Sequence, residues 1–319
     1  MKAVVLGAGS WGTVFARLLA DRGVEVTLAA HRPDDAAAIA ATGCNPRFSS
    51  GVDLSDVDVC TIVEAPVEDV DVVVVAVPSR VFRETVDRLV GDTPVLSLTK
   101  GLDPATGERL STLVRGRAVA VLSGPNMAEE VVAGLPAASV IASADAAFAQ
   151  LLQETINSLV FRVYLNDDLV GVELCAAAKN VIALAAGAVD GLHLGDNAKA
   201  ALVTRGLVEM ARLGEALGAD PETFFGLAGM GDLVVTCWHP SGRNRRAGEL
   251  IARGRTPEEA VAEIGQVVEG LATAPVLRDL ARRIGVELPI TESVCSVLEG
   301  RSLAELAAGL MGRAPTDER

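Results

Sequence analysis

Aromatic side chains are scarce in this chain, where phenylalanine, tryptophan and tyrosine together make up 3% of the residues. Half of the residues are nevertheless hydrophobic, so the core must be built from alanine, valine and leucine rather than from packed rings. The chain is 319 residues long. Because single hydrophobic cores stop growing at about 250–300 residues, this length favours two domains.

Positive charge is also in short supply. Lysine and arginine number 28 against 42 aspartates and glutamates, which gives a net charge of −14. General binding to nucleic acid or to an anionic membrane needs a basic field, so the composition argues against both classes of function. A small anionic substrate is compatible with it, provided that a local cationic pocket opposes the overall field.

Cysteine and histidine are few and scattered. The five cysteines form no Cys-x-x-Cys pair, and His31, His193 and His239 have no metal-ligand spacing. We therefore expect reduced thiols in a cytoplasmic protein and no metal site. The N-terminus has no secretory pattern. The longest apolar stretch, Leu169–Val189, is interrupted by charged residues, so it predicts a buried helix rather than a membrane span.

The N-terminal segment predicts a strand–helix–strand unit. The apolar run Lys2–Leu6 predicts a buried strand, Thr13–Asp21 a helix and Val24–Ala30 a second strand. Between the first strand and the helix lies the sequence GAGSWG, residues 7–12. A GxGxxG motif in that place is typical of dinucleotide-binding proteins.

Each glycine of this motif has a physical role. Gly7 permits a tight turn, Gly9 lets a pyrophosphate approach the backbone, and Gly12 lets the helix pack closely on the strand. The N-terminus of the helix then offers N–H groups to the anion.

The second strand ends at His31 and Arg32. An NAD-specific site has an acidic residue there, which binds the ribose 2′-hydroxyl, whereas an arginine accommodates a 2′-phosphate. NADP(H) is therefore favoured as the cofactor, with NAD(H) possible. The alternative is an exposed charge at a strand end.

Further apolar runs predict a doubly wound, mostly parallel sheet of the Rossmann type. Three of these runs end in polar, turn-forming residues, and Lys100 and Asn126 lie in those turns. Ligands bind beyond the carboxyl ends of such strands, so both side chains are expected at the same crevice as the glycine motif. The predicted strands are 70–77, 95–98 and 118–122, with 137–142 and 160–164 as two more candidates.

From residue 167 onward the pattern becomes helical. We therefore expect a dinucleotide-binding domain over residues 1–166 and an all-helical domain over residues 167–319. Lys179 lies in the middle of an apolar helix, where an unpaired ammonium group is costly. It either faces a polar site, with a pKa suited to acid–base chemistry, or it reaches the surface or pairs with Glu173.

Two more segments of the helical half bear polar groups. Residues 226–233, GLAGMGDL, lead into Asp232, which could be a plain helix N-cap. Residues 241–249, SGRNRRAGE, place three arginines and an asparagine at a predicted helix start. Cations beside N-terminal amides make a phosphate site, and an exposed turn with salt bridges is the alternative.

Together these segments resemble the NAD(P)-dependent glycerol-3-phosphate dehydrogenase family of bacteria. The matching words are GAGSWG, TKGL, SGPNMAEE, GVEL with AAKNV, DGLHLGDNAKAALVTRG, GLAGMGDLVVTC, RNRR and GQVVEG, and they run along nearly the whole chain. The resemblance implies a homodimer that transfers a hydride reversibly between NAD(P)H and C2 of dihydroxyacetone phosphate. The product, sn-glycerol 3-phosphate, would supply phospholipid synthesis.

The resemblance also implies a role for each matched residue. Lys179 would be the proton acceptor in oxidation, Lys100 would contact substrate and cofactor, and Asp232 would position the substrate or Lys179. The other implied substrate contacts are Gly124, Asn126, Gly242, Arg243 and Asn244. The implied cofactor contacts are Gly7, Gly9, Ser10, Trp11, Gly12, His31, Arg32, Lys100, Ala128, Arg243, Val267 and Glu269.

Two positions depart from the family pattern. Gly242 stands where the family usually has serine, so one phosphate or hydroxyl contact is missing or comes from a backbone N–H. Residues 175–178, CAAA, replace more usual glycines beside Lys179. Two rival functions are a ketopantoate- or hydroxy-acid-type reductase, which would not need the arginine cluster, and a dinucleotide-binding sensor that has lost turnover.

Overall fold

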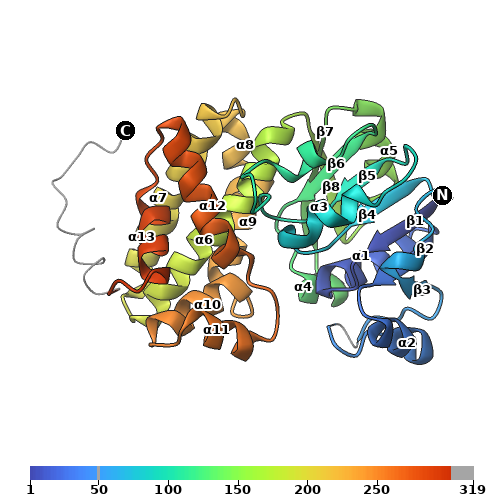
Figure 1. The fold of residues 1–319 in the computed structure, drawn as a ribbon, viewed down its shortest axis with the longest axis horizontal. Coiled ribbons are helices and arrows are strands. Elements are labelled where there is room, and N and C mark those ends of the chain that lie inside the picture. The colour runs from blue at the N-terminus through green and yellow to red at the C-terminus, as the bar shows by residue number, and fades with distance from the viewer. Residues whose placement is uncertain (49–50, 303–319) are drawn as a thin grey trace.

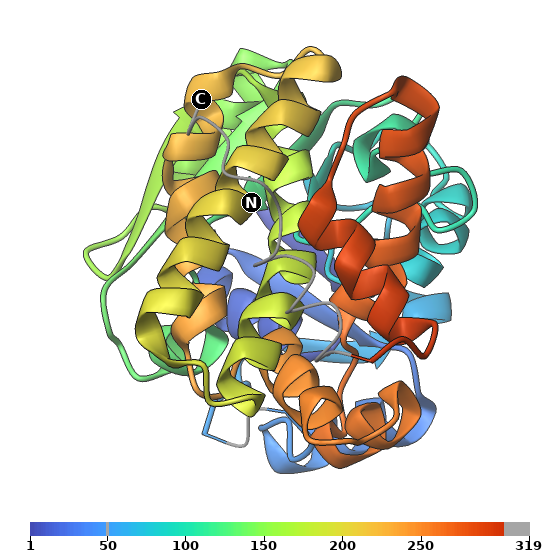
Figure 2. The same ribbon diagram turned by 90° about the vertical axis from the view of Figure 1, so that its left-hand side faces the viewer.

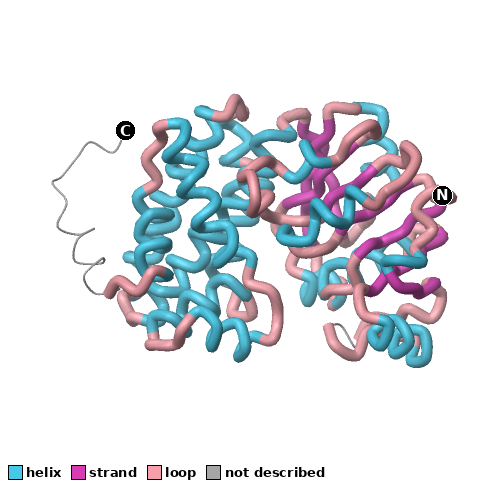
Figure 3. Tube along the Cα trace, viewed as in Figure 1, coloured by secondary structure: helices cyan, strands magenta, loops and turns pink. Residues whose placement is uncertain are grey.

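The computed structural model describes residues 1–48 and 51–302, which form two parts side by side (Figure 1). One part contains the strands of the described chain and the other is built of helices (Figure 3). The predicted fold class is confirmed, namely a Rossmann-type mostly parallel sheet followed by an all-helical domain.

The N-terminal part is an eight-stranded sheet with the order β3-β2-β1-β4-β5-β6-β7-β8. Neighbouring strands run parallel except for β6 and β7. The strand order reverses beside β1, and ligands of such sheets bind beyond the carboxyl ends of the strands at that point. The strands are β1 (Lys2–Leu6), β2 (Glu25–Ala30), β3 (Asp58–Thr61), β4 (Val72–Val75), β5 (Val95–Ser97), β6 (Val119–Ser123), β7 (Ala137–Ser143) and β8 (Phe161–Asn166).

Both faces of the central strands are buried, which explains their continuous apolar runs. In β1, Val5 packs in a core with Phe15 of α1, whereas Val4 packs in a second core with Phe82 of α3. The helical segments of this part are α1 (Ser10–Ala20), α2 (Pro33–Thr42), η1 (Ile62–Glu64), α3 (Ser79–Asp87), η2 (Leu110–Leu113), α4 (Ala128–Val132) and α5 (Ala146–Ile156).

The predicted strands lie within two residues of the observed ones at each end. The prediction missed β3, because its residues are exposed or half-buried at the sheet edge and give no apolar run. It also began the first helix three residues late, since α1 starts at Ser10 inside the glycine motif. In addition, β7 runs antiparallel to β6, with Ser123 opposite Val140, so the segment after β6 lies beside the first half of β7.

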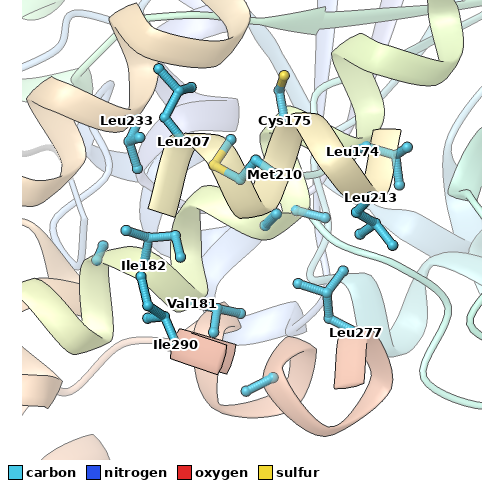
Figure 4. Close-up of a cluster of buried hydrophobic side chains, with 14 of the residues drawn as sticks. Leu174, Cys175, Val181, Ile182, Leu207, Met210, Leu213, Leu233, Leu277 and Ile290 are labelled. Carbon is cyan, nitrogen blue, oxygen red and sulfur yellow. The ribbon is translucent and has the colours of Figure 1, made fainter. Parts of the chain in front are cut away.

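The helical part is organised around α6 (Leu169–Gly191). Among the described residues, α6 alone has the length and apolar composition of a membrane span, and 83% of its most apolar window is buried inside the protein. Apolar side chains from α6, α7, α9, α12 and α13 meet in one cluster around it (Figure 4). The prediction of a buried helix is confirmed.

Helix α10 (Arg243–Ala252) packs against α6 without space for side chains at the contact. A Cβ added at Gly187 would lie 1.8 Å from the carbonyl oxygen of Arg245, and one at Gly248 would lie 1.9 Å from that of Leu184. Figure 2 views these helices in front of the sheet. The others are α7 (Gly195–Ala216), α8 (Pro221–Phe225), η3 (Leu227–Gly231), α9 (Asp232–Trp238), α11 (Pro257–Ile264), α12 (Glu269–Ile284) and α13 (Pro289–Leu298).

Candidate active site

The glycine motif connects β1 to α1 in a tight turn. Gly7 has a φ of +116°, and a Cβ added there would lie 2.7 Å from the carbonyl oxygen of Ala76. A Cβ at Gly12 would lie 1.9 Å from the oxygen of Gly7, whereas one at Gly9 would meet no atom within 4 Å. The turn therefore excludes side chains at two positions and leaves open space at the third, beside the start of α1.

The residues of this turn fit a dinucleotide. Gly9 is the N-cap of α1 and no side chain caps the helix, so the first N–H groups point to an anion site. The indole Nε1 of Trp11 is buried and has no hydrogen-bond partner among the described residues. Its ring lies 5.8 Å from that of Phe15. Trp11 therefore packs beside the turn with its indole donor unpaired, which is rare for a buried polar group.

His31 and Arg32 follow β2, and both are exposed. The Nε of Arg32 lies 4.0 Å from Oδ2 of Asp35, which belongs to the first turn of α2. The strand end therefore presents a cation where NAD-specific sites have a carboxylate.

Lys100 and Lys179 meet at the carboxylate of Asp232, although the three residues come from three separate segments. Asp232 accepts a hydrogen bond from Lys179 Nζ at 2.6 Å and another from Lys100 Nζ at 2.8 Å, one on each oxygen. Lys179 comes from α6 and Lys100 follows β5, so this carboxylate joins the two domains. The side chains of Lys179 and Asp232 are 6% and 3% exposed.

The cluster combines two ammonium groups with one carboxylate, which leaves an excess of positive charge in a buried place. Burial lowers the pKa of Lys179 from 10.5 to about 7, with Lys100 adding to this effect and Asp232 opposing it. Burial alone would raise the pKa of Asp232, but the charges of Lys100 and Lys179 hold it below its ordinary value. A lysine with a pKa near neutrality can both take up and donate a proton.

Lys100 also reaches the loop after β6. Its Nζ donates to the Asn126 side-chain oxygen at 3.1 Å and lies 3.3 Å from the carbonyl oxygen of Gly124. The amide of Asn126 donates to Ser139 Oγ at 2.9 Å, and a Cβ at Gly124 would lie 2.8 Å from Cα of Ser139. The antiparallel β7 therefore fixes the loop that bears Gly124 and Asn126 against Lys100.

Sequence reasoning missed Thr236, whose Oγ1 accepts from Lys179 Nζ at 2.9 Å. Thr236 lies four residues after Asp232, and this helical spacing is the signal that could have found it. The alternative pairing of Lys179 with Glu173 is wrong. Glu173 instead accepts hydrogen bonds from Arg109 Nη1 and from the backbone N–H of Ser111, both at 2.8 Å.

The arginine cluster divides into residues with different partners. Arg243, at the start of α10, is exposed and donates to the carbonyl oxygen of Val267 at 3.2 Å. Arg245 pairs with Asp190 at 2.6 Å and Glu249 at 3.1 Å, so the salt-bridge alternative holds for this arginine. The N-cap of α10 is Gly242, and no side chain caps the helix. A Cβ there would lie 3.1 Å from two carbonyl oxygens, so a serine at this position would require them to shift by a few tenths of an ångström.

Asn244 is buried, and both polar atoms of its side chain have partners. Its amide donates to the Asn180 side-chain oxygen at 2.9 Å, and its own oxygen accepts from the N–H of Gly270 at 2.9 Å. The predicted phosphate contact of Asn244 therefore requires its second amide hydrogen or its backbone N–H.

The remaining predicted cofactor contacts come from both domains. Glu269, at the start of α12, accepts from the N–H of Ser79 at 3.1 Å and from its Oγ at 2.6 Å. Ser79 begins α3 just beyond β4, the strand next to β1. Ala128 begins α4. The residues from the helical domain therefore face the edge of the sheet that bears the glycine motif.

A glycine turn shaped for a pyrophosphate, facing a helical domain that contributes a buried lysine, defines a two-domain dinucleotide-dependent dehydrogenase. The model of the NAD-dependent glycerol-3-phosphate dehydrogenase N-terminus matches residues 2–149, and that of the C-terminus matches residues 168–308. The chain belongs to the NAD-dependent glycerol-3-phosphate dehydrogenase family.

Relatives along the full length agree with this family. The chain is 45% identical to a glycerol-3-phosphate dehydrogenase [NAD(P)+] of Chlorobium limicola, covering 100% of this chain and 99% of the relative. It is 46% identical to one of Moorella thermoacetica, covering 98% and 96%. The crystal structure of glycerol-3-phosphate dehydrogenase from Coxiella burnetii has a TM-score of 0.94 at 38% identity, covering 98% of this chain and 99% of that one.

A more distant structure shares the fold alone. A ketopantoate reductase from Ralstonia eutropha has a TM-score of 0.60 at 19% identity, covering 94% of this chain and 97% of that one. The two-domain build is therefore common to enzymes with different substrates, and the function has to be argued from the site.

Proposed function

We propose that the chain catalyses reversible hydride transfer between NAD(P)H and C2 of dihydroxyacetone phosphate, with sn-glycerol 3-phosphate as the product. The observation that carries this proposal is the Asp232 carboxylate, which joins Lys179 of the helical domain to Lys100 of the sheet domain. The family and its relatives, named glycerol-3-phosphate dehydrogenases, support the choice of substrate.

Lys179 is the proposed acid–base group. In the reducing direction, negative charge develops on the carbonyl oxygen, and the Lys179 ammonium donates a proton to it. Lys100 stabilises the developing charge from the other side of Asp232. In the oxidising direction, neutral Lys179 accepts the hydroxyl proton. Asp232 holds both amines in place, and Thr236 orients Lys179 through its hydroxyl.

The start of α10 is the proposed phosphate anchor. Arg243 supplies a charged donor, and the uncapped helix supplies backbone N–H groups. Because Gly242 has no hydroxyl, the contact that a serine would make falls to the backbone. Anchoring the phosphate away from the reacting carbon orients the substrate, which is how remote binding energy raises the rate.

The glycine motif with Trp11, His31 and Arg32 is proposed to hold the dinucleotide, aided by Ala128 and Glu269. When bound, the nicotinamide supplies or accepts the hydride at its C4. Arg32 at the end of β2 supports a preference for NADP(H).

Arg32→Ala is expected to raise the Michaelis constant for NADPH by about tenfold and to leave that for NADH nearly unchanged. The physical reason is that a charge-assisted hydrogen bond to the 2′-phosphate is worth about 1.5–3 kcal/mol, and NADH lacks this group. Steady-state kinetics with each nucleotide at saturating substrate measures the two constants. Equal changes in the Michaelis constants for NADPH and NADH would show that Arg32 does not bind the 2′-phosphate.

The two directions of the reaction are expected to depend on pH with opposite sign. Burial sets the pKa of Lys179 at about 7. Oxidation needs the neutral amine, so its rate rises as pH increases through about 7, whereas reduction needs the ammonium and slows. Single-turnover rates of hydride transfer, followed by nicotinamide absorbance, test this. Asp232→Asn removes a charge that raises the pKa of Lys179, so the pH profiles of both directions should move to lower pH. If oxidation and reduction both speed up, or both slow down, as pH increases through about 7, Lys179 is not the acid–base group.

A substrate panel distinguishes this proposal from its rivals. NADPH oxidation is measured with dihydroxyacetone phosphate, unphosphorylated dihydroxyacetone and ketopantoate. Strong preference for the phosphorylated ketone supports the proposal, and preference for ketopantoate supports a hydroxy-acid reductase. Binding of NADPH without turnover of any ketone supports a sensor.

The homodimer is proposed to form on a groove of about 400 Å³ between α7 and α9. Its rim includes Met230, Val234 and Trp238, which are 44%, 46% and 40% exposed, and methionine and tryptophan are enriched in interfaces.

A domain boundary between residues 166 and 167 is supported by the end of β8 at Asn166 and the start of α6 at Leu169. The role in phospholipid synthesis rests on the family resemblance and the cytoplasmic location on the scattered cysteines, and both stay predictions.

A further inference from the structure

The loop after α2 is anchored to the glycine motif by a buried asparagine. Asn45 is 2% exposed. Its amide donates to the carbonyl oxygen of Ala8 at 3.0 Å and to Oγ1 of Thr13 at 2.8 Å. Its side-chain oxygen accepts from the N–H of Arg47 at 3.2 Å. Because Ala8 belongs to the glycine motif, the backbone at Arg47 is held beside the proposed dinucleotide site.

Two arginines share one carboxylate at this place. Nη1 of Arg47 lies 3.2 Å from Oδ2 of Asp35, and Nε of Arg32 lies 4.0 Å from the same oxygen. The side chains of Arg32 and Arg47 are about half exposed, at 54% and 45%, and that of Asp35 is 26% exposed. Three charged groups from the end of β2, the first turn of α2 and the following loop therefore converge where both guanidinium groups can reach an incoming anion.

We propose that Arg47 and Asp35 set the selectivity of this chain between NADPH and NADH. The inference rests on the proposed function, since it concerns the cofactor of that site. Arg47 is the second cation for the 2′-phosphate, beside Arg32. Asp35 opposes both arginines, because its carboxylate accepts a hydrogen bond from Arg47, attracts Arg32 and repels the phosphate. The two arginines and the one carboxylate together leave a modest net attraction for the 2′-phosphate. NADPH is therefore preferred only modestly, and NADH can also be used.

NADPH and NADH differ only by the 2′-phosphate, so the pair isolates this effect. A guanidinium group forms charge-assisted hydrogen bonds to phosphate, and a change of tenfold in affinity corresponds to about 1.4 kcal/mol. The three side chains are partly exposed, so salt screens their interactions. We therefore expect effects of several-fold that weaken as ionic strength rises.

The experiment measures dissociation constants of NADPH and NADH by fluorescence titration on the full chain. Arg47→Ala is expected to weaken NADPH binding about fivefold to tenfold and to leave NADH binding unchanged. Asp35→Asn is expected to tighten NADPH binding about threefold, again without effect on NADH. Both changes should shrink at high salt.

Arg88→Ala and Glu84→Gln are the matched controls. Arg88 and Glu84 form an exposed ion pair in the same domain, at the C-terminal end of α3, so they change the net charge equally but away from the glycine motif. Neither control should alter the ratio of the two dissociation constants. Melting temperatures show whether each variant is folded, and Arg47→Lys, which keeps the charge, should retain part of the preference for NADPH.

Two results overturn the inference while leaving the proposed function intact. One is an equal loss of both nucleotides in Arg47→Ala, and the other is an unchanged NADPH-to-NADH ratio in both Arg47→Ala and Asp35→Asn. By contrast, wild-type protein that binds neither nucleotide overturns the proposed function itself.

Discussion

Lys179→Ala is expected to reduce turnover by about a thousandfold or more while NADPH still binds. General acid–base groups contribute about 10²–10⁴ to a rate, and the alanine variant loses the only amine that α6 presents to Asp232. The nucleotide is proposed to bind through the glycine motif and Arg32, which Lys179 does not contact. The measurements are kcat with dihydroxyacetone phosphate and the dissociation constant of NADPH.

Two further variants separate chemistry from stability. Lys199→Ala is the matched control, because Lys199 is also 6% exposed and ion-paired, with Asp190 at 2.8 Å, yet lies outside the Asp232 cluster. It should lower the melting temperature without a comparable loss of kcat. Lys179→Arg keeps the charge but does not release its proton near neutrality, so it should be nearly as inactive as the alanine variant. Near-normal turnover in Lys179→Ala eliminates Lys179 as the acid–base group.

Most strands of the sheet were predictable because each gives a local apolar pattern. Strands buried on both faces give continuous apolar runs, and the glycine spacing between β1 and α1 is a local sequence motif, although the atom that excludes a side chain at Gly7 belongs to the distant Ala76. β3 was not predictable on this basis, since its residues are only partly buried. The direction of β7 depends on how the segment after β6 folds back, which no run of residues reveals.

The candidate site was predictable in its members but not in its connections. Lys179 was recognisable as a charge on an apolar helix, and Lys100 as a polar residue after a strand. Each lysine donates to one oxygen of Asp232, and this arrangement depends on how the two domains pack. The spacing of residues along the chain does not reveal that packing. The same reason explains Glu173, whose partner Arg109 lies in the other domain. For Asn244, a position at a helix start gave no sign that Asn180 and Gly270 engage its side chain.

Arg243→Ala is expected to raise the Michaelis constant for dihydroxyacetone phosphate about a hundredfold. Loss of a charge-assisted contact to phosphate costs about 1.5–3 kcal/mol, and a hundredfold corresponds to about 2.7 kcal/mol. The preference for the phosphorylated ketone over dihydroxyacetone should fall by a similar factor, because the unphosphorylated ketone never uses this contact. Steady-state kinetics with the two ketones at saturating NADPH measures both quantities.

Arg245→Ala is the control for this variant, because it removes the same charge two residues further along the same helix. The guanidinium of Arg245 is committed to Asp190, Glu249 and the carbonyl oxygen of His239. Its loss should therefore reduce thermal stability and change the ratio of the two ketones little. If Arg243→Ala and Arg245→Ala affect that ratio equally, the phosphate is held by the general positive field of the cluster. If neither affects it, the start of α10 is not the phosphate anchor, since a dianion bound there must respond to the nearest exposed guanidinium.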